Sequence, residues 1–142
     1  MTPALNALVT ALVFSLAPPP ALPDGATPVG ENFTARLESG QALSKAPYSL
    51  VMQKDGNLVL YADARPCWSS NSPGSPGAYA RYDKNPANPS AILTVERLEG
   101  DPPQLKVIRT YTGQLAPGAT AGDVHLDAQG TAWLAATPLG KC

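Results

Sequence analysis

The stretch Tyr48–Tyr61, YSLVMQKDGNLVLY, decides the fold class of this chain. It holds two runs in which apolar residues alternate, separated by Asp55-Gly56, and Asp-Gly between such runs is a strong signal for a β-hairpin. Side chains alternate faces along a strand. The pattern therefore predicts strands at Tyr48–Gln53 and Asn57–Tyr61 with one face turned to a core: Leu50, Met52, Leu58 and Leu60.

The opposite face of this hairpin gathers hydrogen-bonding side chains. Gln53, Asn57, Val59 and Tyr61 fall on it, around the turn residue Asp55. A carboxylate only accepts hydrogen bonds, whereas an amide does both and a phenol does either. Fixed planar groups that meet adjacent hydroxyls distinguish axial from equatorial oxygens, and Val59 would contact ring carbons. The face suits a sugar ring, with a single-site affinity on the order of mM that multivalency would raise.

The rest of the chain also reads as β-structure. Short alternating runs are separated by Gly, Pro, Asn and Asp, and 16 prolines with 12 glycines in 142 residues leave no room for a helical bundle. A long surface loop is expected over Ser72–Ser90. The further strands expected are Thr34–Leu37, Ala42–Leu43, Cys67–Ser69, Ala91–Glu96, Leu105–Tyr111, Val124–Leu126 and Thr131–Ala135. The length suits one all-β domain.

Residues 34–72 resemble the bulb-type mannose-binding lectins of monocots. The hairpin matches their signature Q-x-D-x-N-x-V-x-Y at all five positions, and the flanks LESGQALS (Leu37–Ser44) and CWSSNS (Cys67–Ser72) are similar in style. The resemblance implies a β-prism II of three antiparallel four-stranded sheets with pseudo-threefold symmetry. It also implies mannose as ligand, homodimers made by exchange of C-terminal strands, and no cofactor. The residues that would hold the 2-, 3- and 4-hydroxyls of mannose are Gln53, Asp55, Asn57 and Tyr61.

A three-sheet prism predicts two more copies of the motif. One candidate is His125-x-Asp127-x-Gln129-x-Thr131-x-Trp133, in which only Asp127 is identical to the signature. We expect a weak second site there, around His125, Asp127 and Gln129. An alternative alignment sets Trp133 against Trp68.

The middle copy is harder to find. Ala91–Glu96 and Gln104–Ile108 could form its hairpin, with Glu96 at the Gln position of the signature and Gln104 at the Asn position. The connection RLEGDPP between them is too long for the family turn. We therefore expect one competent site, one weak site and one lost site.

The only cysteines are Cys67 and Cys142. One disulfide between them would close a long loop and stabilise the fold by about 4 kcal/mol on the chain-entropy model. Two independent thiols, or a bond from Cys142 to another chain, remain as alternatives. Two cysteines and one histidine are too few for a structural zinc site, so no metal is expected. The family often carries a cysteine at the position of Gly56, so this pairing departs from its pattern.

The first charged residue of the chain is Asp24. Residues 4–17, ALNALVTALVFSLA, form an apolar run of signal-peptide length that is too short for a bilayer, which needs roughly 20 residues. We expect a signal peptide over residues 1–23, a lectin domain over 24–142 and secretion; the alternative is a disordered apolar tail. The glycosylation sequon Asn32-Phe33-Thr34 favours the same compartment.

Composition narrows the function classes. Lys and Arg number 10 against 11 Asp and Glu, and this balance argues against a nucleic-acid partner. The single histidine, His125, has no nucleophile motif or paired carboxylates beside it, so no enzyme is expected. Trp68 and Trp133 are expected to pack in the core, and residues 91–111 to form a solvated charged edge or a partner-docking edge. Two hypotheses remain: a mannose-binding lectin with one principal site, or a lectin-fold module for protein interaction that has lost sugar binding.

Overall fold

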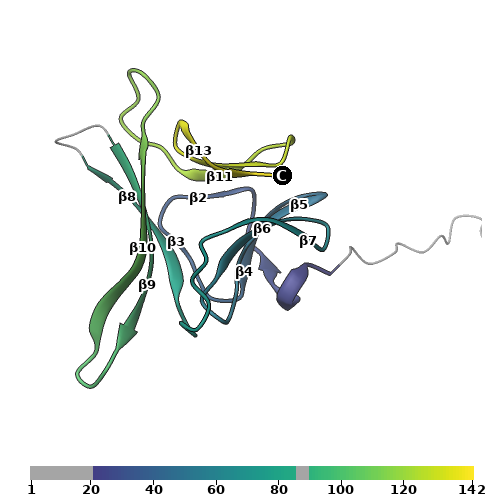
Figure 1. The fold of residues 1–142 in the computed structure, drawn as a ribbon. Helices are drawn as coiled ribbons and strands as arrows, with labels where there is room; N and C mark the ends of the chain where they lie inside the picture. The colour runs from purple at the N-terminus through teal and green to yellow at the C-terminus, as the bar shows by residue number, and fades with distance from the viewer. Residues whose placement is uncertain (1–20, 86–89) are drawn as a thin grey trace, which may run out of the picture.

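The structure, a computed structural model, describes residues 21–85 and 90–142, which fold into three β-sheets around a common core (Figure 1). Apart from a short 3₁₀ turn, η1 (Pro23–Gly25), the regular elements of this part are strands. The all-β expectation is confirmed. Sheet A holds β1 (Thr27–Pro28), β4 (Gln41–Lys45), β5 (Tyr48–Met52), β6 (Leu58–Ala62) and β7 (Arg65–Ser69).

The other sheets complete the prism. Sheet B holds β2 (Asn32–Phe33), β11 (Val124–Leu126), β12 (Thr131–Leu134) and β13 (Thr137–Lys141). Sheet C holds β3 (Arg36–Leu37), β8 (Tyr79–Asn85), β9 (Ser90–Glu99) and β10 (Gln104–Gln114). All pairings within sheets B and C are antiparallel; in sheet A, β1 adds a parallel strand beside β4.

One apolar core joins the sheets, because each turns its alternate side chains inward. Sheet A contributes the predicted inward residues of β5 and β6, all of them fully buried: Leu50, Met52, Leu58 and Leu60. Phe33, Val124 and Leu134 come from sheet B, and Leu93 and Val95 from sheet C. The hairpin that the sequence predicts is therefore confirmed, with the predicted face inward.

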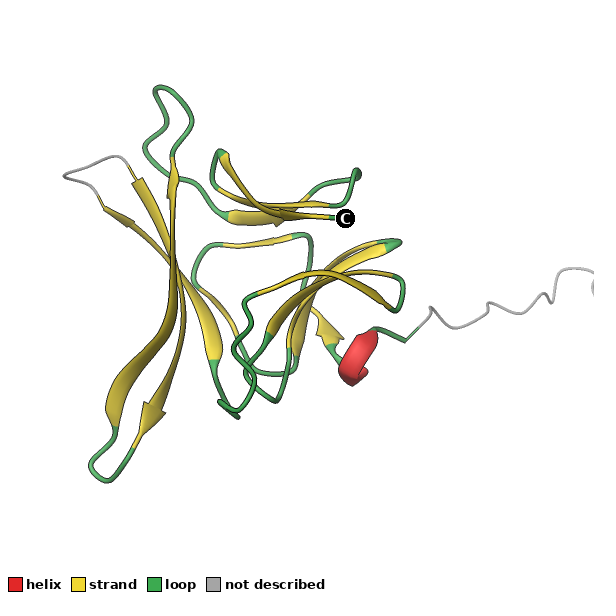
Figure 2. Cartoon of the chain, in the orientation of Figure 1, coloured by secondary structure: helices red, strands yellow, loops and turns green. Residues whose placement is uncertain are grey.

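The strand order makes the sheets counterparts of one another. In each, an N-terminal strand is followed by three strands linked as successive hairpins: β4-β5-β6-β7, β2-β11-β12-β13 and β3-β8-β9-β10. The counterparts of the β5–β6 hairpin are therefore β11–β12 and β8–β9. Figure 2 shows the three groups of strands arranged around the centre.

The middle copy lies elsewhere than expected. Strand β8 occupies part of Ser72–Ser90, where a loop was expected. Its side chains alternate as in a strand, with Ala80 and Tyr82 buried in the core and Arg81 turned outward. Strands β9 and β10 do pair as a hairpin, but at the place that β6 and β7 take in sheet A. Glu96 and Gln104 are thus not at motif positions. The β8–β9 turn, residues 86–89, lies outside the described residues.

A disulfide ties sheet A to the C-terminus. Cys67 of β7 and Cys142, which follows β13, are bonded with their Cα atoms 4.9 Å apart. A sequence separation of 75 residues corresponds to about 4 kcal/mol of stabilisation on the chain-entropy model. Beside it, the indole of Trp68 packs on the core and meets the ring of Tyr111 edge to face, 5.7 Å between centroids.

The β9–β10 hairpin extends beyond the body of the prism (Figure 2). Its distal part exposes the side chains of Leu98, Leu105 and Val107, while Arg97, Glu99 and Lys106 form ion pairs there.

Within the described ranges, no helix has the length and apolar character that crossing a membrane requires. The expected signal peptide falls almost entirely on residues 1–20, which lie outside the described part.

Gly56, where the family often has cysteine, is enclosed by the chain. Its φ is +94°, and a Cβ built on it would lie 2.3 Å from the carbonyl oxygen of Ser75. The segment after β7 folds back over the turn, with the Ser75 N–H donating to the Asp55 carbonyl at 2.9 Å. A side chain at position 56 has no space, which explains the glycine.

We predict that Gly56→Ala destabilises the fold by about 2–5 kcal/mol, because a left-handed backbone strain of about 1–2 kcal/mol adds to an overpacking cost of about 1–3 kcal/mol. Gly74→Ala is the matched control: its φ is +85° but nothing lies within 4 Å of the added Cβ. It should cost only the strain. Denaturant unfolding measures both, and equal losses would contradict the close approach of Ser75.

Candidate functional site

The turn of the β5–β6 hairpin is shaped by its own residues. The Gln53 N–H donates to the Asn57 carbonyl at 2.9 Å, and the Gly56 N–H donates to the Gln53 carbonyl at 3.0 Å. Asp55 adds a side-chain bond, since its Oδ1 accepts the Asn57 N–H at 2.9 Å. The carboxylate is exposed, so its Oδ2 remains directed to solvent and to any ligand. The motif thus stabilises the turn and presents acceptors at the same time.

The sequence-predicted side chains lie together on the outer face of this hairpin. Gln53 Nε2 donates to the hydroxyl of Tyr61, which joins the two ends of the motif. Gln53, Asn57 and Tyr61 are partly buried, whereas Val59 is only 4% exposed and forms the floor of the face. In this arrangement Val59 offers little apolar surface to a sugar ring, less than its place in the motif suggests.

Two serines orient Asn57. Its Oδ1 accepts hydrogen bonds from Ser70 Oγ at 3.1 Å and from the Ser72 N–H at 3.2 Å. The Ser70 and Ser72 hydroxyls, both buried, lie 2.6 Å apart. With its oxygen engaged, the Asn57 amide turns its NH₂ group outward as a donor. Both serines lie in CWSSNS (Cys67–Ser72), a segment that resembles the lectin family. The sequence alone assigns them no role in the site.

The N-terminal segment adds a carboxylate that the sequence did not predict. Asp24 Oδ2 accepts the N–H of Lys54, the residue between Gln53 and Asp55, at 3.2 Å. Leu22 and Tyr61 pack against a small cluster of Ala26, Ala42 and Val51 on the same side of the sheet. Asp24 has a left-handed backbone conformation, φ 61°, and no apolar pattern in the sequence indicates it.

Tyr61 remains protonated across the neutral range. Burial raises the pKa of its hydroxyl, the hydrogen bond with Gln53 opposes the rise, and the charges of Asp24 and Asp55 raise it further. The phenol therefore donates and accepts hydrogen bonds at neutral pH. Because the folded-state pKa is raised, the contribution of Tyr61 to stability is present below about pH 10 and lost as the pH rises through that pKa.

The second copy of the motif has a different register from the expected one. In the β11–β12 turn the Asp127 N–H donates to the Thr131 carbonyl at 3.0 Å, and the Gly130 N–H donates to the Asp127 carbonyl at 3.3 Å. These bonds repeat those of Gln53, Asn57 and Gly56. Asp127 therefore corresponds to Gln53, not to Asp55 as the spacing suggested, and the whole alignment shifts by two residues.

The shift changes what stands at each position. Gln129 takes the place of Asp55, Thr131 of Asn57, Trp133 of Val59 and Ala135 of Tyr61. The β11–β12 hairpin thus has no amide at the Gln53 and Asn57 positions of the signature and no phenol at the Tyr61 position. His125 pairs with Trp133 on the outer face. The expectation that Trp133 packs in the core is therefore wrong, whereas for Trp68 it is confirmed.

Sheet C carries an ion-paired network on its outer face. The carboxylate of Glu96, 1% exposed, accepts hydrogen bonds from Arg81 Nε at 2.8 Å, from the Tyr79 hydroxyl at 3.3 Å and from Thr94. Burial by itself would raise the pKa of Glu96, but these bonds and the Arg81 charge bring it below its usual value. The network satisfies its own polar groups, so it offers little to a ligand.

Among the described residues, no cluster of three or more acidic, His or Cys side chains could hold a metal.

Solved structures of three plant lectins share this fold. The snowdrop (Galanthus nivalis) mannose-specific agglutinin complexed with methyl-α-D-mannoside superposes with a TM-score of 0.55 at 22% identity, covering 75% of this chain and 90% of that one. The Polygonatum cyrtonema lectin complexed with monomannoside gives 0.53 at 23% identity, covering 72% and 86%. The bluebell (Scilla campanulata) mannose-specific bulb lectin gives 0.52 at 21% identity, covering 76% and 85%.

The sequence itself matches a relative over a short stretch. A mannose-specific lectin of Aloe arborescens is 47% identical over 38 residues, 27% of this chain and 35% of the relative, so the match spans about a third of that protein. No protein-family model matches the chain. Together the comparisons confirm the resemblance to bulb-type mannose-binding lectins. The fold is the β-prism II of that class.

We predict that Asp24→Asn lowers the pKa of Tyr61 towards the ordinary value of 10.0, because it removes one of the two carboxylate charges that raise it. The asparagine carbonyl can still accept the Lys54 N–H. Asp101→Asn, in the exposed β9–β10 turn, is the charge-matched control and should leave that pKa unchanged. A site-resolved NMR titration of the Tyr61 ring measures the effect. No difference between the two variants would contradict the position of Asp24.

Proposed function

We propose that the protein is a lectin that binds mannose-containing glycans through one principal site, formed by Gln53, Asp55, Asn57 and Tyr61 with Val59 beneath. The observation that carries the proposal is the joint presentation of these side chains on one outer face, around a turn whose shape Asp55 itself fixes. The β-prism fold and the mannose specificity of the snowdrop and Aloe arborescens lectins support it.

Each side chain has a distinct role towards neighbouring sugar hydroxyls. The free oxygen of Asp55 accepts from a hydroxyl, and the outward NH₂ of Asn57 donates to the same or the next one. The Tyr61 hydroxyl, which accepts from Gln53, can donate its own proton to a sugar oxygen, while the Gln53 carbonyl accepts. A ligand with adjacent hydroxyls in the mannose arrangement would satisfy donors and acceptors that are otherwise left to water.

The site binds reversibly and makes no covalent bond. Because it is exposed and shallow, single-site affinity should be on the order of mM. Homodimers or larger assemblies would raise the avidity, and secretion directed by residues 1–23 would bring the site to extracellular glycans. Asp24 adds a second carboxylate charge to that of Asp55 beside the site, and this charge disfavours acidic sugars.

We predict that immobilised high-mannose glycan retains the protein, and that free methyl-α-mannoside shifts the amide resonances of residues 53–61. Asn57→Ala should weaken binding beyond detection, because it removes the donor and releases Ser70 and Ser72. Tyr61→Phe should weaken it about tenfold, the loss of one hydrogen bond of about 1.4 kcal/mol.

Asp101→Asn serves as the distant control and should bind as the wild type does. Folded protein that ignores dense mannan, together with capture of a protein partner, would instead favour the interaction-module hypothesis. Unimpaired binding by Asn57→Ala would place the site elsewhere.

A further inference from the structure

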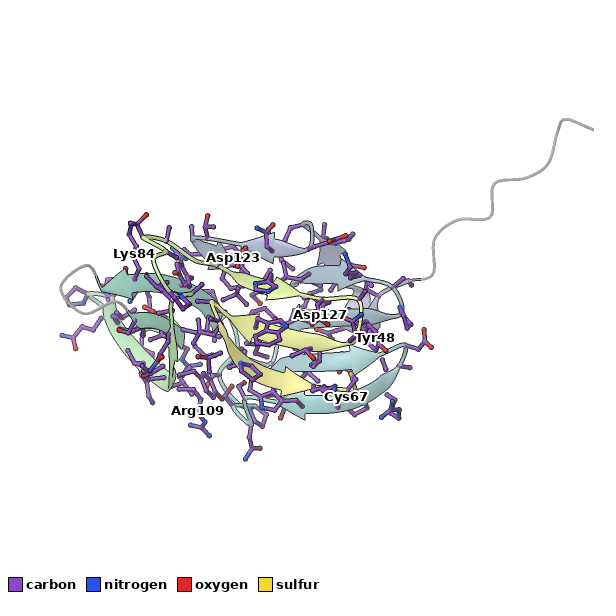
Figure 3. All side chains as sticks on the ribbon, turned by 90° about the horizontal axis from the view of Figure 1, so that it is seen from above. Tyr48, Cys67, Lys84, Arg109, Asp123 and Asp127 are labelled. Atoms are coloured by element: carbon purple, nitrogen blue, oxygen red, sulfur yellow. A yellow bond between two sulfur atoms is a disulfide. The ribbon has the colours of Figure 1, made fainter. Side chains whose placement is uncertain are left out.

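The outer face of sheet B carries a pair of aromatic rings that the proposed mannose site does not use. His125 of β11 and Trp133 of β12 stand directly opposite each other in the ladder. Their ring planes differ by 11° and their centroids lie 6.1 Å apart, so the rings are nearly parallel. Both side chains are partly exposed. Figure 3 looks onto this face, with Asp123 and Asp127 labelled along it.

Each ring is fixed by a carboxylate that binds its nitrogen. Trp133 Nε1 donates to Asp127 Oδ2 at 2.8 Å, and His125 Nδ1 donates to Asp123 Oδ1 at 2.7 Å. Asp123 is held in turn, since its Oδ2 accepts from Asn32 Nδ2 at 2.9 Å. Asp127 Oδ1 also accepts the backbone N–H groups of Gln129 and Thr131. The rings are therefore positioned before any ligand arrives, which lowers the entropy cost of binding.

The chemistry of this face differs from that of the mannose site. His125 Nδ1 and Trp133 Nε1 are already engaged and both side chains are partly exposed, so a ligand would meet mainly aromatic carbon surface here. An aromatic face is electron-rich and attracts the weakly positive C–H groups of a sugar ring. The carboxylates of Asp123 and Asp127 lie at the edges of the pair, where hydroxyl groups of the same sugar can donate to them.

Stacking of this kind selects for ring configuration. In β-linked glucose and N-acetylglucosamine every ring substituent is equatorial, so both ring faces present unbroken C–H groups. Mannose has an axial 2-hydroxyl that interrupts one of these faces. An aromatic pair therefore prefers gluco-configured sugars, whereas the amide and phenol groups of sheet A read neighbouring hydroxyls.

We propose that His125 and Trp133 form a second carbohydrate site, which binds β-linked sugars of the gluco configuration, including N-acetylglucosamine, by stacking. The site lies where the prism repeats the hairpin of the mannose site, but it uses other residues and other chemistry. The proposal does not depend on mannose binding by sheet A.

A purely structural role for the pair makes a different prediction. Opposed aromatic residues on neighbouring strands stabilise a sheet without any ligand. In that case the pair would affect unfolding alone, and no sugar would perturb its resonances. Binding and stability must therefore be measured in the same variants.

The test is an NMR titration of the whole chain with N,N′,N″-triacetylchitotriose, with mannotriose as the comparison sugar. The chitotriose should shift the Trp133 indole N–H and the His125 ring in a saturable manner, and mannotriose should not. Trp133→Leu and His125→Ala should each weaken binding at least tenfold. Trp133→Phe, which keeps an aromatic face and removes the bond to Asp127, should weaken it a few-fold and protects the test against loss of folding.

Asn57→Ala is the matched control in sheet A and should bind chitotriose as the wild type does. Shifts that persist in folded Trp133→Leu, equal shifts with mannotriose, or no shift at all would each overturn the proposal. Wild-type protein that binds chitotriose but not methyl-α-mannoside would contradict only the proposed function of sheet A, so the two failures are distinguishable.

Discussion

Burial of one face of each sheet in a common core is the constraint on which the rest of the structure depends. Leu50 and Leu60 of sheet A, Val124 of sheet B and Leu93 of sheet C all reach the same centre. A sheet whose inner face is fixed in this way cannot shift its register by one residue, because every side chain would change face. The outer faces carry no such restriction, and they are where the sheets differ.

The outer faces of the three sheets carry different side-chain chemistry. Sheet A presents amides, a carboxylate and a phenol around Asn57, and sheet B presents the His125 and Trp133 rings held by carboxylates. On sheet C, Arg81 neutralises the buried Glu96. Two backbone bonds of the β5–β6 turn recur in β11–β12, so the two turns share a backbone shape and carry different side chains. One common core therefore supports three outer faces of different chemistry.

The sequence predicted the hairpin at Tyr48–Tyr61, its buried face and the joint position of the motif side chains, because alternation and the Asp-Gly turn are local signals. It did not predict the register of the second copy. Asp127 fits the signature at the wrong position, and only the hydrogen bonds of the turn reveal the correct one. Strand β8 was missed because the prolines and glycines around it resemble a loop. The approach of Asp24 to Lys54 is a contact between distant segments, for which the sequence holds no local signal.

The central claim is that the chain has one mannose site, formed by the motif side chains on the outer face of sheet A. An NMR titration with methyl-α-mannoside counts the sites directly, because each occupied face shifts its own amide resonances. The geometry predicts one mannoside bound per chain, lost in Asn57→Ala and kept in Trp133→Phe. A stoichiometry of two or three per chain, or binding that survives Asn57→Ala, would contradict the claim.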